Sequence, residues 1–408
     1  MLSQKTIDIV KSTAPILAER GVEITSVFYK RLFEKHPELL NIFNHANQKK
    51  GRQQAALANT VYAAAEHIDR LEVILPAVKQ IAYKHRSLGV KPEHYPIVGE
   101  NLLAAIKEVL GHAATDDIIQ AWGEAYGVIA QAFIDIEKEM YLEAKEQTGG
   151  WAGFKAFKVV KKEIESSVIT SFYLKPADGS NVPDYLPGQY ISVRLQIEGE
   201  AYLFNRQYTL SDSPGKGYFR ISVKREADGH FPHGQVSNYL HDHVEIGDEI
   251  EVSAPAGEFV LDQGTSPVYL LGGGVGITPL MSMLNDLANK KSARQTVFIQ
   301  ASKNGEMTAF RNEVKEKMDS LPNGESYLFL ENPTSIDRQD GGFDHQGFIG
   351  LAFLETIIKD PNAKFYICGP VPFMKAMIEN LEQLGIKEAN IHYEFFGPSL
   401  NLKEKQFV

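Results

Sequence analysis

The hydrophobic periodicity of this chain changes twice along its length, and these changes constrain the fold more than any other feature. Residues 1–147 repeat apolar side chains at helical spacing, whereas residues 152–262 show short runs in which apolar and polar residues alternate. Residues 265–408 alternate strand-like and helix-like segments around a glycine-rich turn. A period near 3.6 indicates helices and strict alternation indicates half-buried strands. The sequence therefore predicts a multidomain protein.

Each of the three regions predicts a different architecture. Residues 1–147 are expected to form an all-α bundle of about six or seven helices. Residues 152–262, whose short strands are separated by Gly and Pro, predict an antiparallel β-barrel. Residues 265–408 predict an α/β domain with a doubly wound parallel sheet.

Bulk composition excludes several classes of function. The net charge of −10 argues against a nucleic-acid-binding face. A single cysteine excludes a disulfide framework and suits a reducing compartment. Charged residues interrupt the N-terminal apolar stretch, which is unlike a signal peptide, and no apolar run reaches the ~20 residues of a membrane span. We expect a cytoplasmic monomer.

A glycine-rich turn, LLGGGVGITPL, connects a buried strand to a helix start in the third region. Glycines allow the backbone to approach a pyrophosphate, and helix-start amides complement its charge. Thr278 is expected to cap the helix and Pro279 to lie in its first turn. The alternative is a tight turn without a ligand. The predicted nucleotide-binding residues here are Gly273, Gly274, Val275, Gly276, Ile277, Thr278 and Pro279.

A second landmark of the same region is YICGP at the end of a later strand. Cys368, Gly369 and Pro370 are expected at the carboxyl edge of the sheet, where such folds bind ligands. Cys368 by itself could equally be a core residue. Ser302 and Lys303 stand where an acidic residue would favour NADH, so the choice between NADH and NADPH stays open.

The second region contains one extended run, FNRQYTLSD, with the chemistry of a flavin site. Arg206 and Tyr208 share one strand face because side chains alternate. Arginine can bind a pyrophosphate and tyrosine can stack on a planar ring. An ordinary strand with a surface arginine is the alternative. The other candidates are Gln207, Thr209, Tyr190 after a PGQ turn, and Ser237 at a helix start.

Together these motifs resemble the ferredoxin–NADP reductase superfamily over residues 152–408. The resemblance implies that Arg206 and Ser237 hold the phosphates of FAD and that Tyr208 lies against its ring, with Thr209 near the reactive nitrogen. Many members have serine at the position of Thr209. The segment IHYEFFGP resembles the one that covers the flavin in this superfamily. It adds Glu394, Phe395, Phe396, Gly397 and Pro398 to the expected FAD site.

A lone histidine, His85, lies on an apolar helix face in the first region. Val78, Ile81 and Ala82 precede it at helical spacing. Taken alone, such a residue is more often a locally hydrogen-bonded core histidine. A haem group would favour the ligand interpretation, because the porphyrin supplies four nitrogen ligands to the iron and the protein needs to supply only one.

The surrounding spacing supports a haem site. Phe43 follows Pro37 by six residues, as in a globin corner, and Gln53 follows Phe43 by ten. His85 comes 32 residues after Gln53, and Tyr29 lies on the preceding predicted helix. The complete chain, a globin followed by flavin and NAD(P)H domains, resembles the flavohaemoglobins.

This resemblance assigns roles to the first region. His85 becomes the proximal ligand of haem b. Without the resemblance, Glu137 would be a solvated residue and Tyr95 a packed aromatic. The catalytic residues it implies are Tyr29, Gln53, Tyr95 and Glu137, and the pocket residues are Phe43, Leu57, Val61 and Lys84.

The implied activity is that of a nitric oxide dioxygenase, in which electrons pass from NAD(P)H through FAD to haem and nitric oxide is oxidised by dioxygen to nitrate. The same electron path would also serve a reductase of hydroperoxides, ferric iron or quinones. A sensor of dioxygen or nitric oxide, and a plain ferredoxin reductase with a helical appendage, are further alternatives.

Overall fold

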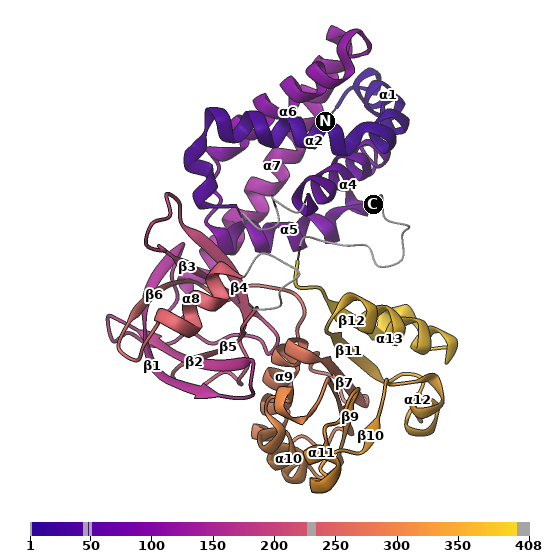
Figure 1. Ribbon diagram of the computed structural model, residues 1–408. Helices are drawn as coiled ribbons and strands as arrows, with labels where there is room; N and C mark the ends of the chain where they lie inside the picture. Colours follow the sequence, from indigo (N-terminus) through magenta and orange to yellow (C-terminus); the bar gives the residue numbers. More distant parts are fainter. Residues whose placement is uncertain (1, 44–47, 49–50, 227–233, 398–408) are drawn as a thin grey trace.

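The computed structural model describes residues 2–43, 48, 51–226 and 234–397. Figure 1 shows three regions: a helical bundle at the top, a β-domain at the lower left and an α/β domain at the lower right. In the described ranges, no helix is both long and apolar enough to cross a membrane.

The first region is entirely helical where it is described. Ser3 accepts a hydrogen bond from the Thr6 amide at the start of the first helix, and Thr115 does the same for the last. Gly89, in the left-handed conformation, ends α5 (Leu75–Leu88). The α-helices are α1 (Gln4–Ser12), α2 (Ala14–Lys35), α4 (Arg52–Glu66), α5 (Leu75–Leu88), α6 (His94–Leu110) and α7 (Asp116–Glu146); the short 3-10 turns are η1 (Pro37–Asn41), η2 (Leu71–Val73) and η3 (Gly111–Ala113).

Small residues allow the helices of this bundle to approach one another closely. A Cβ atom on Gly21 of α2 would lie 3.2 Å from that of Ala58 in α4. A Cβ atom on Gly99 of α6 would lie only 2.4 Å from the ring of Tyr126 in α7. Both glycines therefore fix where the helix pairs cross, and larger residues there would separate the helices.

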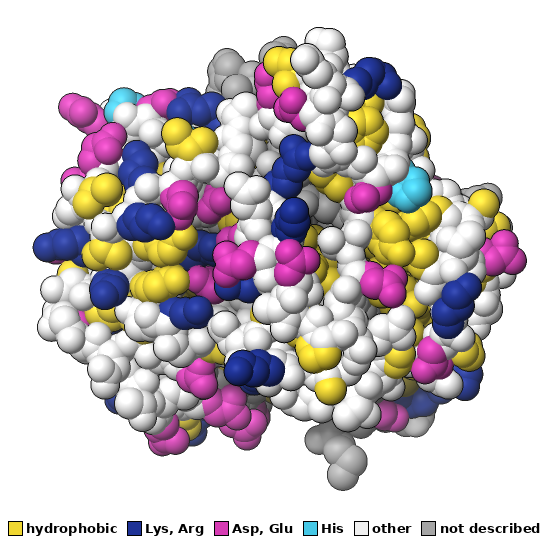
Figure 2. All heavy atoms as spheres, turned by 90° about the horizontal axis from the view of Figure 1, so that it is seen from below, with side chains coloured by type: hydrophobic (Ala, Val, Ile, Leu, Met, Phe, Trp, Pro, Cys, Tyr) yellow, Lys and Arg dark blue, Asp and Glu magenta, His cyan; other side chains and the backbone are white. Residues whose placement is uncertain are grey.

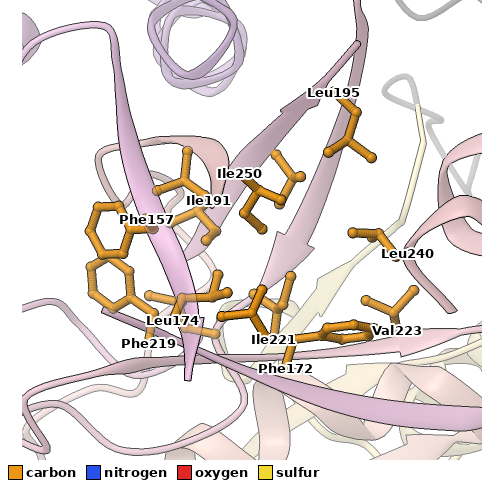
Figure 3. Close-up of a cluster of buried hydrophobic side chains, with 14 of the residues drawn as sticks. Phe157, Phe172, Leu174, Ile191, Leu195, Phe219, Ile221, Val223, Leu240 and Ile250 are labelled. Carbon is orange, nitrogen blue, oxygen red and sulfur yellow. The ribbon is translucent and has the colours of Figure 1, made fainter. Parts of the chain in front are cut away.

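The second region is an antiparallel six-stranded sheet in the order β4-β3-β6-β1-β2-β5. A bridge between Leu210 and Ile221 connects the two edges, so the sheet curls into a barrel. Figure 3 shows its buried core, in which Phe157, Phe172 and Ile191 point inward. The elements are β1 (Phe154–Ile164), β2 (Ile169–Pro176), β3 (Tyr190–Leu195), β4 (Phe204–Thr209), β5 (Phe219–Lys224), α8 (Gln235–His243) and β6 (Glu249–Ser253).

The third region is a parallel six-stranded sheet in the order β10-β9-β8-β7-β11-β12. From β7, strands β8, β9 and β10 are added on one side, and β11 and β12 are then added on the other side of β7. The strand order therefore reverses between β7 and β11, which is the topological switch point of the sheet. The elements are β7 (Val268–Gly273), η4 (Gly274–Gly276), α9 (Ile277–Asn289), β8 (Thr296–Ser302), η5 (Gly305–Met307), α10 (Arg311–Ser320), β9 (Gly324–Leu330), α11 (Ser335–Asp340), β10 (His345–Gln346), α12 (Leu351–Ile357), β11 (Lys364–Cys368), α13 (Val371–Gln383), η6 (Glu388–Asn390) and β12 (Ile391–Glu394).

The predicted architectures of all three regions are confirmed, while the boundaries 1–147, 152–262 and 265–408 stay predictions. One local prediction is wrong. Thr278 does not cap α9, because the helix already begins at Ile277 with Gly276 as its cap residue. The Thr278 hydroxyl instead donates to the Val275 carbonyl, 3.1 Å away, inside the tight η4 turn.

Candidate active site

Three side chains from three helices meet around the histidine that the sequence singled out. Nδ1 of His85, on α5, lies 2.8 Å from Oε1 of Glu137, on α7, and 3.1 Å from the hydroxyl of Tyr95, on α6. The Tyr95 hydroxyl donates to the same Glu137 oxygen over 2.6 Å. Since Glu137 can only accept, the proton of a neutral imidazole belongs on Nδ1 and the lone pair of Nε2 stays available to a metal.

Burial gives this trio its electrostatic character. Glu137 is only 3% exposed, so its carboxylate depends on these two partners for hydrogen bonds. Burial, together with the negative charge of Glu137, raises the pKa of Tyr95 well above its usual value. Tyr95 therefore stays protonated and remains a donor at every physiological pH.

Two further tyrosines of α7 support the trio, and the sequence analysis missed both. The Tyr126 hydroxyl donates to the Tyr95 carbonyl over 2.6 Å. The Tyr141 hydroxyl donates to the Val90 carbonyl over 2.8 Å, just beyond the end of α5. Tyr141 lies one helical turn after Glu137, which is the only signal the sequence offered.

Tyr29 of α2 lies in an aromatic cluster within the larger core of the helical region. Its ring is 4.8 Å from that of Phe28 and 5.7 Å from that of Phe43, edge to face in both cases. Burial raises the pKa of the Tyr29 hydroxyl, and a hydrogen bond with Gln53 partly opposes the shift. The hydroxyl is thus a protonated donor in apolar surroundings.

The expected pocket residues of α4 join this cluster. Leu57 and Val61 follow Gln53 at spacings of one and two helical turns, and both pack into the core that contains Tyr29. That core and the smaller core around Tyr95 share Tyr126 and Ile129 of α7. An available imidazole nitrogen and an apolar cluster with one polar donor are the side chains that a haem group would need.

Lys84, the neighbour of His85, connects the helical region to the end of the third region. Its Nζ donates to the Gly397 carbonyl over 2.8 Å. Burial lowers the pKa of Lys84, and Glu394 opposes this. Burial likewise raises the pKa of Glu394 to about 7, with Lys84 acting in the opposite direction. Pro398, the last residue of the expected segment, lies outside the described residues.

The flavin-site candidates converge on the barrel strands nearest the helices. Arg206 is half-buried in β4, and desolvation lowers its pKa. Gln207 donates over 3.3 Å to the hydroxyl of Ser87, two residues after His85. Tyr208 and Thr209 complete the strand, and Thr209 is paired with Tyr190 of β3. In the loop opposite Tyr190, Gly257 has a φ of +113°, and a Cβ there would lie 3.0 Å from the Tyr190 ring, so glycine is favoured at this position.

At the remaining flavin positions, the structure separates the candidates. Ser237 lies in the first turn of α8, and its hydroxyl donates to the Gly234 carbonyl at 3.1 Å. Phe395 packs against the core of the parallel sheet, whereas Phe396 is 45% exposed. Phe395 is therefore the better placed of the two for contact with a buried ring.

The nucleotide-site candidates meet at one edge of the parallel sheet. Cys368 at the end of β11 is paired with Gly272 of β7 on one side and with Glu394 of β12 on the other. A Cβ on Gly276 would lie 2.3 Å from the Cys368 carbonyl oxygen, so only glycine allows this approach. Gly274 has a φ of +55°, which also favours glycine. This is the close-packed turn that a pyrophosphate requires. Gly273, Val275, Ile277, Pro279, Gly369 and Pro370 lie within or beside it.

A crevice of about 280 Å³ lies where the three regions meet. Glu394 Oε2 and His392 Nε2, both at this crevice, have no hydrogen-bond partner among the residues that the structure describes. Such groups are costly unless a ligand satisfies them, so the crevice fits a polar ring system such as a flavin. Its lining is Gln80, Tyr83, Lys84, Tyr190, Gly257, Glu258, Phe259, Val260, Tyr366, Ile391, His392, Tyr393, Glu394 and Phe395.

Contacts that fix the helical region on the barrel were invisible in the sequence. Asn205, next to Arg206, is buried and donates over 2.6 Å to the carbonyl of Asn41. The Asn41 side chain accepts from the Leu203 amide over 2.9 Å. Ser192 of β3 donates to Ser87 over 3.0 Å. Both the corner before Phe43 and the helix of His85 are thus tied to the barrel.

Comparison with known proteins agrees with this division. A Globin family model matches residues 26–133, an oxidoreductase FAD-binding domain model matches 156–261, and an oxidoreductase NAD-binding domain model matches 270–379. A flavohemoprotein of Bacillus thuringiensis subsp. konkukian (strain 97-27) is 58% identical over 404 residues, 99% of this chain and 100% of that protein. The flavohemoprotein of Bacillus subtilis (strain 168) is 52% identical over 405 residues, again 99% and 100%.

Two solved structures are similar as well. The crystal structure of a flavohemoglobin from Malassezia yamatoensis with bound FAD and heme has a TM-score of 0.84 at 30% identity, covering 97% of this chain and 100% of that one. The FAD/NAD-binding domain of a nitric oxide dioxygenase from Vibrio cholerae has a TM-score of 0.55 at 36% identity, covering 60% and 99%.

The fold and these matches first define a class: the protein is an oxidoreductase that combines a haem-binding globin with FAD- and NAD-binding domains. Relatives that match it from end to end then give the family. The chain belongs to the flavohaemoproteins.

Proposed function

We propose that this protein is a nitric oxide dioxygenase, in which electrons from NAD(P)H pass through FAD to haem and nitric oxide is oxidised to nitrate. The observation that carries the proposal is the Lys84–Gly397 hydrogen bond. It joins Lys84, the residue beside His85, to the segment that follows β12. The last residue of β12, Glu394, lines the crevice. A flavin in that crevice would be adjacent to the proximal helix. The similar FAD/NAD-binding domain from Vibrio cholerae belongs to a protein named nitric oxide dioxygenase, which also supports the proposal.

Three cofactors supply the redox chemistry when bound: the nicotinamide gives a hydride, the flavin passes its electrons on singly, and the haem iron is where dioxygen and nitric oxide combine. Each NAD(P)H provides two electrons, and each conversion of nitric oxide and dioxygen to nitrate consumes one. The expected stoichiometry is therefore two nitrates for each NAD(P)H.

The helical side chains would hold the haem and shape its surroundings. His85 would ligate the iron through Nε2, while Glu137 and Tyr95 hold the imidazole proton at Nδ1 and increase its electron donation. Tyr29, assisted by Gln53, would donate a hydrogen bond to dioxygen. The pocket would be kept apolar and closed to water by Phe43, Leu57 and Val61.

The crevice, together with β4, the start of α8 and the η4 turn, would hold the flavin and the nicotinamide dinucleotide. Arg206 and Ser237 would bind the FAD phosphates, and Tyr190, Gln207, Tyr208, Thr209, Glu394 and Phe395 would surround the ring. The η4 turn would bind the pyrophosphate of the dinucleotide, with Cys368, Gly369 and Pro370 beside it. That the protein is monomeric and cytoplasmic stays a prediction.

The test is NADH- and NADPH-dependent consumption of nitric oxide under oxygen, with nitrate measured at the end. We expect two nitrates for each dinucleotide oxidised. Tyr29→Phe should slow nitrate formation by about tenfold, since one hydrogen bond in an apolar site is lost. Faster turnover with a hydroperoxide than with nitric oxide, on one preparation, would replace this proposal by the reductase alternative.

A further inference from the structure

An ion pair between a buried arginine and a partly buried glutamate joins the barrel to the nucleotide domain. Arg220 of β5 is only 3% exposed, and its guanidinium donates to both carboxylate oxygens of Glu313 in α10, at 2.9 and 3.0 Å. The Phe310 ring lies 5.0 Å from the guanidinium carbon. A two-pronged arginine–carboxylate contact fixes direction as well as distance. The pair therefore sets the angle between β5 and α10.

The same guanidinium reaches the end of the flavin strand. Arg220 Nε donates to the Ser211 hydroxyl over 3.2 Å, and Nη2 donates to the Ser211 carbonyl. Ser211 follows Thr209, the last residue of β4, by two positions. Arg220 thus holds the end of the expected flavin-binding run and α10 at the same time.

The helix that starts at the nucleotide turn is bound to the same cluster. Asn285 of α9 donates to Glu313 Oε1 over 2.7 Å, and Ser282 donates over 2.7 Å to the Asp212 carbonyl. Asn289 donates to the Ser213 hydroxyl. These three residues lie on one face of α9, which is buried along nearly its whole length. Figure 1 shows α9 beside β5, between the barrel and the parallel sheet.

Stability alone is a weak reason for such a cluster. A buried ion pair costs so much desolvation that well-packed apolar residues often stabilise as much or more. The polar cluster instead restricts orientation. The five N–H donors of one arginine and the side-chain amides of α9 are satisfied in only one relative position of the two domains. Transfer of a hydride requires its donor and acceptor to be within ~3.5 Å, and a misplacement of ~1 Å can cost ~100-fold in rate.

We propose that Arg220, Glu313 and Asn285 are positioning residues for the nicotinamide-to-flavin step. They fix the η4 turn relative to the Arg206–Thr209 strand, so that the nicotinamide reaches the flavin at a reactive distance. The proposal rests on one part of the proposed function, the transfer of a hydride from NAD(P)H to FAD. It holds whatever the haem later reacts with.

The test uses the full-length, FAD- and haem-loaded protein. Flavin absorbance is followed under anaerobic conditions after mixing with increasing NADH. For Glu313→Gln, which keeps the size and the acceptor for Asn285, we expect the limiting rate of flavin reduction to fall about tenfold. The affinity for NAD⁺ and the FAD content should stay unchanged. Asn285→Ala, a milder change, should lower the same rate by a smaller factor.

The matched control is Asp242→Asn, which removes the Arg225–Asp242 ion pair (2.7 Å) inside the barrel region. It should leave the limiting rate unchanged. A second measurement, hydrogen exchange of residues 211–213 and of α10, should show faster exchange in Glu313→Gln and not in the control. An unchanged limiting rate in both Glu313→Gln and Asn285→Ala would overturn the proposal, as would a loss of rate fully explained by loss of FAD. Normal flavin reduction without nitric oxide consumption would overturn the proposed function instead.

Discussion

The proximal haem site and the flavin crevice satisfy their polar groups in opposite ways. At the first, His85, Tyr95 and Glu137 come from three helices of one region and hydrogen-bond to one another. At the second, Glu394 Oε2 and His392 Nε2 have no partner among the described residues. The first site is organised by packing within the globin, whereas the second depends on the junction of three regions and on a ligand.

Acidic and basic side chains are intermingled on the face shown in Figure 2, which is the underside of the view in Figure 1. The two sites differ in how their buried polar groups are satisfied. This difference predicts that a substitution at one site will leave the cofactor of the other site bound.

The largest effect is expected for His85→Ala. Removing the proposed iron ligand should lower haem affinity by more than ~100-fold, because loss of a residue that only supports a metal ligand already costs up to ~100-fold. Bound FAD should remain at its normal amount. The ratio of Soret to flavin absorbance in purified protein measures both. His112→Ala, at the exposed η3 turn, is the control and should keep its haem. Parallel loss of FAD would show that the two sites are not independent.

The reciprocal change is Arg206→Met. Loss of charge-assisted hydrogen bonds, worth roughly 1.5–3 kcal/mol each, should weaken FAD binding by about 10- to 100-fold. The haem content should be normal. Calorimetric titration with FAD measures the affinity, and Arg225→Met, on a surface ion pair, is the matched control. Equal FAD affinity in Arg206→Met and in the control would remove Arg206 from the flavin site.

A smaller effect is expected inside the proximal trio. Glu137→Gln and Tyr95→Phe should each lower nitric oxide turnover by about tenfold while the haem stays bound. Because both act through one imidazole, the double variant should be hardly worse than either single one. The iron–histidine stretching frequency in resonance Raman spectra should fall in each. Full additivity of the two losses would mean that the residues act separately.

The smallest effect concerns the pH dependence of stability. The pKa of Glu394 is raised by burial from 4.5 to about 7. Between these values the unfolded carboxyl is ionised and the folded one is protonated, so stability falls as pH rises from about 4.5 to 7 and then levels off. We expect Glu394→Gln to lose this slope, a difference of about 1–2 kcal/mol.

Urea unfolding of FAD-free protein at pH 5 and pH 8 measures this difference. Glu355→Gln, at an exposed site in α12, should behave like the wild type. No comparable slope is expected from Tyr95, because its raised pKa lies outside the neutral range. Identical slopes in wild type and Glu394→Gln would contradict the buried, ligand-dependent character of the crevice.

Much of the fold and of the site was predictable, for reasons that are local. Helical spacing, strand alternation and the glycine turn each depend on neighbours within a few residues, so the three architectures could be predicted from the chain alone. His85 could be selected as a candidate ligand, and that role stays a prediction. The helix start at Thr278 was mispredicted because a residue's capping propensity does not reveal that the 3-10 turn already begins the helix.

What the sequence by itself determined is which segments become helices or strands and which residues are candidates for redox-site chemistry. The tertiary structure alone decided which of them meet: Glu137 with His85, Tyr126 with Tyr95, and Arg220 with Glu313. Backbone preference acts over a few residues, whereas these contacts join positions up to 93 residues apart. They arise only once packed helices and sheets have excluded water and fixed the directions of side chains.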